Sequence, residues 1–134
     1  MTDDYLILTQ PDINKRVAQG ILACENDIAS YNTEIAMHTA AVAALGDIKW
    51  DDSNIKYRWM KRDDLIRDAL NAGLDSTAIQ NILNLVALDN HNGGIISAQF
   101  ELGKTTRNYT NYQNILPAGS DRDTAIAAIS TPTA

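Results

Sequence analysis

The chain has 134 residues, which is enough for one modest hydrophobic core. Apolar residues make up 45% of it and aromatic residues only 6%, so Ala, Leu and Ile dominate and favour helix. The formal net charge of −6 argues against a protein covered in phosphate contacts. Because Cys24 is the single cysteine, an internal disulfide is excluded.

No run of about 18 apolar residues occurs, so we predict no membrane-spanning segment. The first ten residues hold two acids and no basic cluster, which argues against a secretory signal peptide. We therefore expect a protein of the cytoplasm or of a virus particle.

A long first helix is predicted from Thr9, which precedes Pro11 and Asp12 in the pattern of a capped N-terminus. Gly46 should end it. Its apolar positions recur in alternating steps of four and three, which is a heptad pattern. We predict that this stripe is an oligomer interface, formed by Val17, Ile21, Ile28, Tyr31, Ile35, His38, Val42 and Leu45.

The helix partner of this stripe is left open. The flanking heptad positions carry acids but no Lys or Arg, whereas self-pairing zippers usually bring complementary charges there. The partner helix is therefore non-identical, antiparallel or part of the same chain. A helix of this length spans roughly 50 Å, more than the diameter of a globule of this size. The helix should therefore protrude, bend back at a break near Gly20 or be covered by other subunits, and we expect oligomerisation.

Two shorter helices are predicted next. Ser53 should cap a helix from about Asn54, with a fresh start at Asp63 and an end at Gly73. Asp75 should cap the following helix, which we expect to run to about Leu88. The segment 90–94, Asn-His-Asn-Gly-Gly, should break it.

The segment 64–83 resembles a helix-turn-helix motif. Ala69, Gly73 and Ile79 stand at the spacing at which that family places a small residue, the turn glycine and a β-branched residue. The resemblance implies that the second helix presents Thr77, Gln80 and Asn81 to base edges. The residues implied to contact phosphate are Lys56, Arg58, Lys61 and Arg62. The second helix itself has no Arg or Lys.

The C-terminal third is predicted to be extended. Ile96, Ala98, Phe100 and Leu102 alternate with polar residues, which is typical of a strand, and a turn at 103–104 would allow a hairpin with 105–112. One short helix is expected over 121–129. The predicted organisation is therefore an N-terminal segment (1–9), a helical domain (10–89) and an extended C-terminal arm (90–134) with one strand or hairpin.

The sequence offers no catalytic constellation. His38 and His91 are the only histidines, and neither has a second ligand at metal spacing, so we interpret His38 as a residue of the helix stripe satisfied by hydrogen bonding. Cys24 has no base at helical spacing. We predict no enzyme activity, no cofactor and no metal.

The function predicted from these patterns is that of a structural or assembly subunit. Its partners would be further copies of the chain or other protein subunits, and a phage or virus particle component is the specific expectation. The alternative is a small helix-turn-helix protein that binds nucleic acid.

Overall fold

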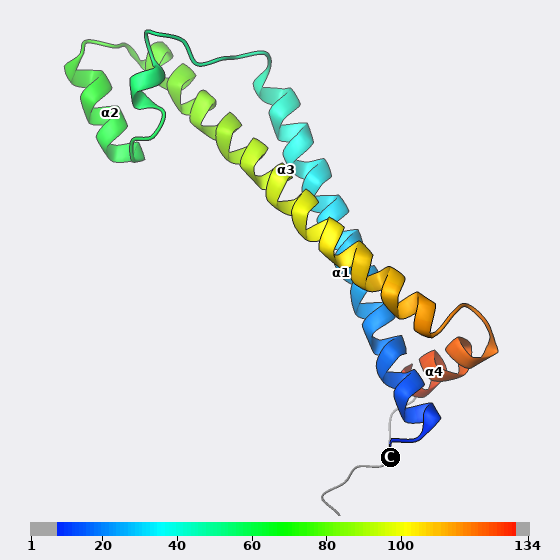
Figure 1. The fold of residues 1–134 in the computed structure, drawn as a ribbon. Coiled ribbons are helices and arrows are strands. Elements are labelled where there is room, and N and C mark those ends of the chain that lie inside the picture. The colour runs from blue at the N-terminus through cyan, green and yellow to red at the C-terminus, as the bar shows by residue number, and fades with distance from the viewer. Residues whose placement is uncertain (1–7, 131–134) are drawn as a thin grey trace, which may run out of the picture. The chain divides into compact units, whose positions relative to one another are not determined.

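The computed structural model describes residues 8–130, and within them every element of regular secondary structure is a helix. Four α-helices, α1 (Gln10–Leu45), α2 (Arg62–Asn71), α3 (Ser76–Ile115) and α4 (Ser120–Ser130), are accompanied by a short 3₁₀ helix, η1 (Ile55–Tyr57). Figure 1 colours them in chain order. The mainly α class and the long first helix are confirmed.

The ends of α1 follow the predicted signals. The Thr9 hydroxyl donates to the Asp12 carboxylate at 2.8 Å, and the Asp12 amide donates back to that hydroxyl at 3.3 Å. The second bond satisfies a free amide of the first turn. The Thr9 hydroxyl and the Thr9 amide, which both donate to the carboxylate, lower the pKa of Asp12. Gly46 follows the last helical residue with φ +80°, a conformation that suits glycine. No break occurs at Gly20, because α1 is one uninterrupted helix.

The predicted strand and hairpin are wrong. The segment 96–112 is part of α3, which also runs through the predicted break at 90–94 and past the predicted end at Leu88. The alternation divides between two helix faces. Ala98 is buried and Leu102 half-buried, whereas Ile96 and Phe100, also four residues apart, are exposed. Over seven residues, apolar positions that alternate as in a strand also recur every four residues, as they do on the faces of a helix.

Polar residues in the last turns of α3 are compatible with this helix. The hydroxyl of Thr106 donates to the Leu102 carbonyl at 2.7 Å, and that of Thr110 donates to the Thr106 carbonyl at 3.0 Å. Bonds of this kind satisfy hydroxyl groups within a helix. The short helix expected over 121–129 is confirmed as α4.

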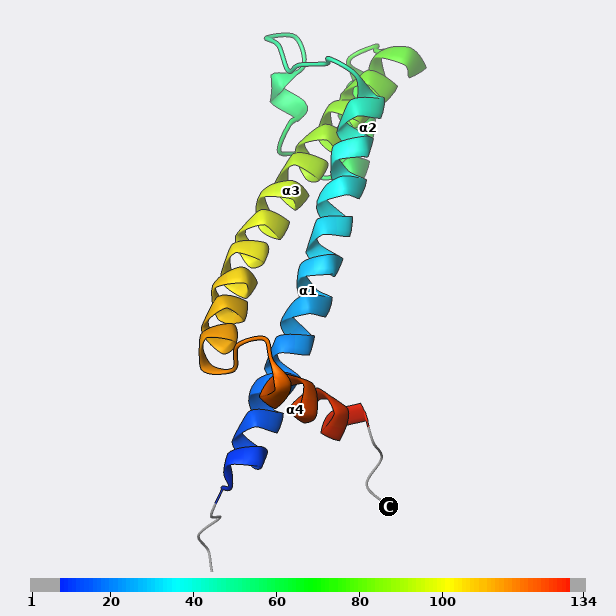
Figure 2. The same cartoon turned by 90° about the vertical axis from the view of Figure 1, so that its right-hand side faces the viewer.

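The chain divides into two compact units. The first combines α1 up to Asn32 with the chain from Phe100 onward. In it α4 lies beside the start of α1 (Figures 1 and 2). Its core consists of Val17, Ala18, Ile21, Leu116 and Ala125, with Tyr109, Tyr112, Ile126 and Ile129 packed against it.

Gly20 explains how the Tyr112 ring enters this unit. A Cβ at position 20 would lie 2.6 Å from the ring, which is closer than real contacts allow. The Tyr109 hydroxyl donates to the Glu25 carboxylate at 3.1 Å. Cys24 is also buried in this part of α1, and burial raises the pKa of its thiol.

The second unit comprises residues 33–99, that is the end of α1, the loop that follows, η1, α2 and the first part of α3. The helix expected from Asn54 is only the three-residue η1, and α2 starts separately at Arg62. Ser53 does not cap a helix, because its amide and hydroxyl both bond to the Asp51 carboxylate. The buried core of this unit consists of Tyr57, Leu65, Ala69, Ile79 and Ile82.

Candidate functional site

The pair α2–α3 has the features expected of a helix-turn-helix. Ala69 is fully buried, Ile79 is buried beside it, and Gly73 in the turn has φ +85°. The Asp75 carboxylate accepts a hydrogen bond of 2.8 Å from the Ala78 amide, so Asp75 caps α3 as predicted. The sequence spacing therefore identified the turn, both helices and their inward residues.

The residues that the resemblance assigns to base edges are on the surface. Thr77, Gln80 and Asn81 are all exposed in the first turns of α3. The Gln80 amide donates to the Asn84 side chain at 2.9 Å along the same helix. Polar side chains are therefore available here, but Asp51 lines the same pocket as Asn81.

The basic residues assigned to phosphate fall into two groups. Lys56, Lys61 and Arg62 are exposed, and the described residues give none of them an ion pair. Arg58 instead donates to both oxygens of Asp89, at 2.9 and 3.0 Å. The interaction is bidentate, so Arg58 fixes the 50–60 segment to α3 and is less available to a ligand.

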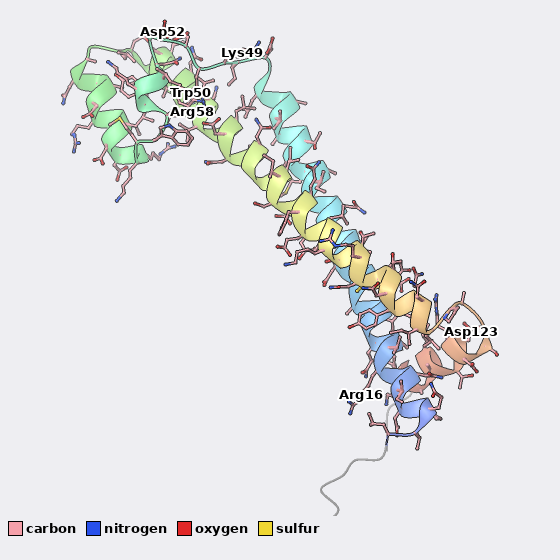
Figure 3. The ribbon with its side chains drawn as sticks, in the orientation of Figure 1. Arg16, Lys49, Trp50, Asp52, Arg58 and Asp123 are labelled. Atoms are coloured by element: carbon pink, nitrogen blue, oxygen red, sulfur yellow. The ribbon has the colours of Figure 1, made fainter. Side chains whose placement is uncertain are left out.

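Trp50 and Trp59 flank Arg58. The Arg58 guanidinium lies 5.7 Å from the Trp50 ring and 5.1 Å from the Trp59 ring. Figure 3 shows Trp50 and Arg58 side by side, and the Trp50 indole also donates to Asp89 at 3.1 Å. Trp50 thus belongs to a structural network, while Trp59 remains 85% exposed.

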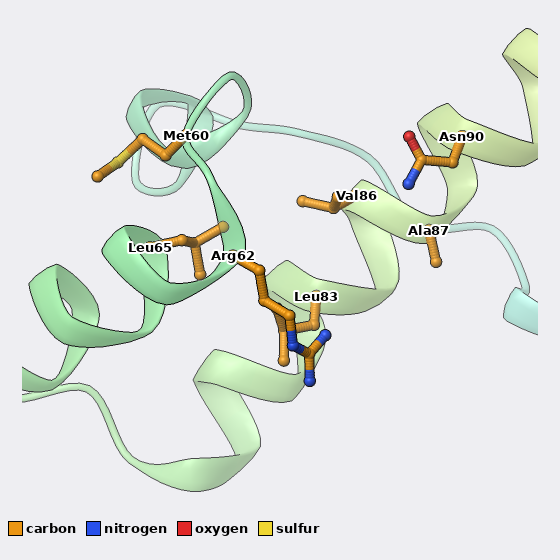
Figure 4. A pocket seen from close by; sticks show the side chains of 7 residues that line it. All are labelled: Met60, Arg62, Leu65, Leu83, Val86, Ala87 and Asn90. Carbon is orange, nitrogen blue, oxygen red and sulfur yellow. The ribbon is translucent and has the colours of Figure 1, made fainter.

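A cavity of about 210 Å³ lies between α2 and α3 (Figure 4). Its lining residues are Met60, Arg62, Leu65, Leu83, Val86, Ala87 and Asn90. Arg62 is the only charged residue among them, so the cavity offers apolar space but no acid–base pair. Nothing in this lining suggests a reaction.

The predicted interface stripe on α1 faces largely into the chain itself. Val17 and Ile21 are buried in the core of the first unit. The other six residues are half-buried: Ile28, Tyr31, Ile35, His38, Val42 and Leu45. An intramolecular partner was one of the alternatives left open by the sequence. That these residues form an oligomer interface stays a prediction, and Val17 and Ile21 have the least surface to offer to it.

One surface on the second unit lacks charged side chains, and the sequence did not indicate that its two segments lie together. On α1 the residues from Ile35 to Leu45 include no Asp, Glu, Lys or Arg, and on α3 the same holds from Asn90 to Gln99. The two segments meet where His38 and His91 share a hydrogen bond of 2.9 Å between their Nδ1 atoms. We call these two segments the uncharged belt.

Exposed apolar and small residues occupy the outer side of the belt. Met37 is 58% exposed and Ile96 67% exposed. The remaining exposed positions are small or polar, namely Ala36, Thr39, Ala40, Ala43, Ala44, Asn90, Asn92, Gly93, Ser97 and Gln99. The lack of charge could have been found from the sequence, but the exposure of Ile96 could not while that segment was interpreted as a strand.

Metal, membrane and family comparisons add no assignment. Within residues 8–130, no three His, Cys, Asp or Glu side chains converge into a metal-binding group. None of the helices in that range is long and apolar enough to cross a membrane. The chain matches no protein-family model, and no curated protein or solved structure is significantly similar to it.

Proposed function

We propose that this protein is a structural subunit that assembles with further copies of itself through the uncharged belt of its second unit. The observation that carries the proposal is the exposure of Met37 and Ile96 on two helix segments without charged side chains. Depletion of charge in a surface that presents apolar residues is typical of the centre of a protein–protein interface.

The net charge of the chain favours this surface for self-association. Two copies that each carry a net charge of −6 repel one another, and contact through charged faces would add to that repulsion. The belt brings no like charges together. The exposed alanines have small side chains and Gly93 has none, which allows the helices of a second copy to approach closely.

Burial of the apolar side chains of the belt favours association. Each large aliphatic side chain that passes from exposed to buried contributes about 1.5–3 kcal/mol. In a two-fold symmetric pair each contributing residue counts twice, because both copies use the same surface. Met37 and Ile96 together then supply several kcal/mol, and the resulting four-helix packing is a common arrangement for helical hairpins.

Sedimentation velocity of matched variants tests the proposal. Ile96→Asp and Met37→Asp should dissociate the assembly, because each buries a carboxylate at the centre of the contact. Ile115→Asp and Leu70→Asp are controls with 62% and 59% exposure outside the belt, and they should leave the sedimentation coefficient unchanged. If all four variants sediment like the wild type, the belt is not the interface.

A phage or virus particle is the specific assembly predicted from the character of the sequence. It fits a small helical subunit that contacts copies of itself, and it remains a proposal.

The second candidate function is nucleic-acid binding by α2 and α3, favoured by the burial of Ala69 and Ile79 and by the positive φ of Gly73 in the turn. Fluorescence anisotropy with duplex DNA at low and moderate salt would test it. Binding should weaken with salt and disappear in the double variant Lys61→Glu/Arg62→Glu. A wild-type protein that shows no binding at low salt would exclude this candidate.

A further inference from the structure

The only two histidines of the chain meet in the second unit, although they are far apart in the sequence. His38 on α1 and His91 on α3 have their Nδ1 atoms 2.9 Å apart and their ring centroids 5.2 Å apart. Both residues are half-buried. One ring must donate the shared proton and the other must accept it, because two neutral imidazoles cannot both donate through the same pair of nitrogens.

Gly94 leaves the space that the His38 ring occupies. A Cβ at position 94 would lie 2.6 Å from Nε2 of His38 and under 3 Å from two further ring atoms. Glycine is disfavoured inside a helix, but at this position any larger residue would collide with the ring. A Cβ at the neighbouring Gly93 would have nothing within 4 Å, so that position shows no such reason.

Glu34 lies near the ring nitrogen of His38 that faces away from His91. Its carboxylate lies 3.8 Å from Nε2 of His38, one helical turn away. A carboxylate on that side favours the proton on Nε2 and leaves the Nδ1 lone pair free. Carboxylates orient metal-binding histidines in the same way, through the ring nitrogen that does not touch the metal.

We propose that His38 and His91 bind a divalent transition-metal ion of the Ni²⁺ or Cu²⁺ type through their two Nδ1 atoms. His91 first transfers its Nδ1 proton to its Nε2 by exchange with water, so both rings stay neutral and both lone pairs become available. The ion replaces the shared hydrogen bond. The described residues provide no third ligand, so water completes the coordination shell.

The spacing fits the ion. Two metal–imidazole bonds of about 2.05 Å that meet at a right angle place their nitrogens about 2.9 Å apart, whereas a tetrahedral angle would need about 3.3 Å. The observed separation is 2.9 Å. Right angles are typical of octahedral and square-planar ions, of which Ni²⁺ and Cu²⁺ are examples. The rings must reorient from the hydrogen-bonded arrangement for both lone pairs to point at the ion.

Thermal unfolding of the full chain with NiCl₂ tests the site. We expect the Tm to rise by on the order of 10 °C at a hundredfold excess over the dissociation constant, with one ion per chain by calorimetry. MgCl₂ should have no effect. His38→Gln and His91→Gln should each abolish the rise, and Cys24→Ser should retain it, because the buried thiol is not a ligand. A rise that persists in His91→Gln overturns the proposal.

A second measurement needs no variant. The electron paramagnetic resonance spectrum of wild-type protein with one equivalent of Cu²⁺ should show two imidazole nitrogens, and the same sample in denaturant should lose this signal. A single coordinated nitrogen, or a spectrum unchanged by denaturant, overturns the proposal. Both ligands come from one chain but lie within the uncharged belt, so the same spectrum is expected from the Ile96→Asp variant, in which self-association is removed.

Discussion

Adjacent glycines in α3 should respond in opposite directions to the same substitution. Replacing glycine by alanine inside a helix stabilises it by about 1 kcal/mol when the new methyl group has room. Position 93 has room, since no atom lies within 4 Å, whereas at position 94 the methyl group would meet three atoms of the His38 ring below 3 Å. The ring must then move.

The cost at position 94 can be worked from the structure. Overpacking of a fitted site costs about 1–3 kcal/mol. Loss of the His38–His91 hydrogen bond costs a further 0.5–1.5 kcal/mol or so. After the gain of about 1 kcal/mol in helix propensity, Gly94→Ala should lower the free energy of unfolding by roughly 0.5–3.5 kcal/mol, while Gly93→Ala should raise it by up to about 1 kcal/mol.

Urea denaturation followed by circular dichroism measures both variants. The Ile96→Asp background keeps self-association out of the comparison. In a His38→Ala background the penalty of Gly94→Ala should disappear, because the atoms that it meets are gone. If Gly94→Ala is as stable as Gly93→Ala with His38 present, then the His38 ring does not lie against Gly94.

Three further predictions concern the first unit. Ile21→Ala should lower the free energy of unfolding by about 2–5 kcal/mol in urea denaturation, because Ile21 is almost fully buried, and a loss no larger than that of the exposed Ile115→Ala would contradict the core. Cys24 should react slowly with iodoacetamide at pH 8, since burial raises the pKa of its thiol, and a rate equal to that in denaturant would contradict this. The Thr9 hydroxyl and amide lower the pKa of Asp12, so the capping bond stabilises the helix above the ordinary pKa of an aspartate and is lost as the pH falls through the lowered, folded-state pKa. NMR titration should show a higher pKa of Asp12 in Thr9→Ala, and an unchanged value would contradict the cap.

Local signals in the sequence predicted the ends of elements well. Thr9 with Asp12, Gly46, Gly73 and Asp75 each marked a real helix boundary, because caps and left-handed turns depend on one or two neighbouring residues. The same holds for the inward positions of the α2–α3 turn, which lie within a few residues of one another.

The long third helix was not predicted because the contacts that explain it involve residues far away in the sequence. The segment 90–94 has the composition of a helix break, but the structure shows that Gly94 lies within α3 and makes room for His38 from α1. The alternation over 96–102 fits a strand equally well, and only the burial of Ala98 against the exposure of Ile96 separates the two. The His38–His91 pair was missed for the same reason, since 53 residues separate its members.

The central claim is that the chain associates with itself through the uncharged belt, and its molar mass in solution tests this most directly. Sedimentation equilibrium of the wild type across the micromolar range should give a multiple of 14.7 kDa, and Ile96→Asp should give 14.7 kDa at the same concentrations. A wild-type mass of 14.7 kDa throughout that range would contradict the account.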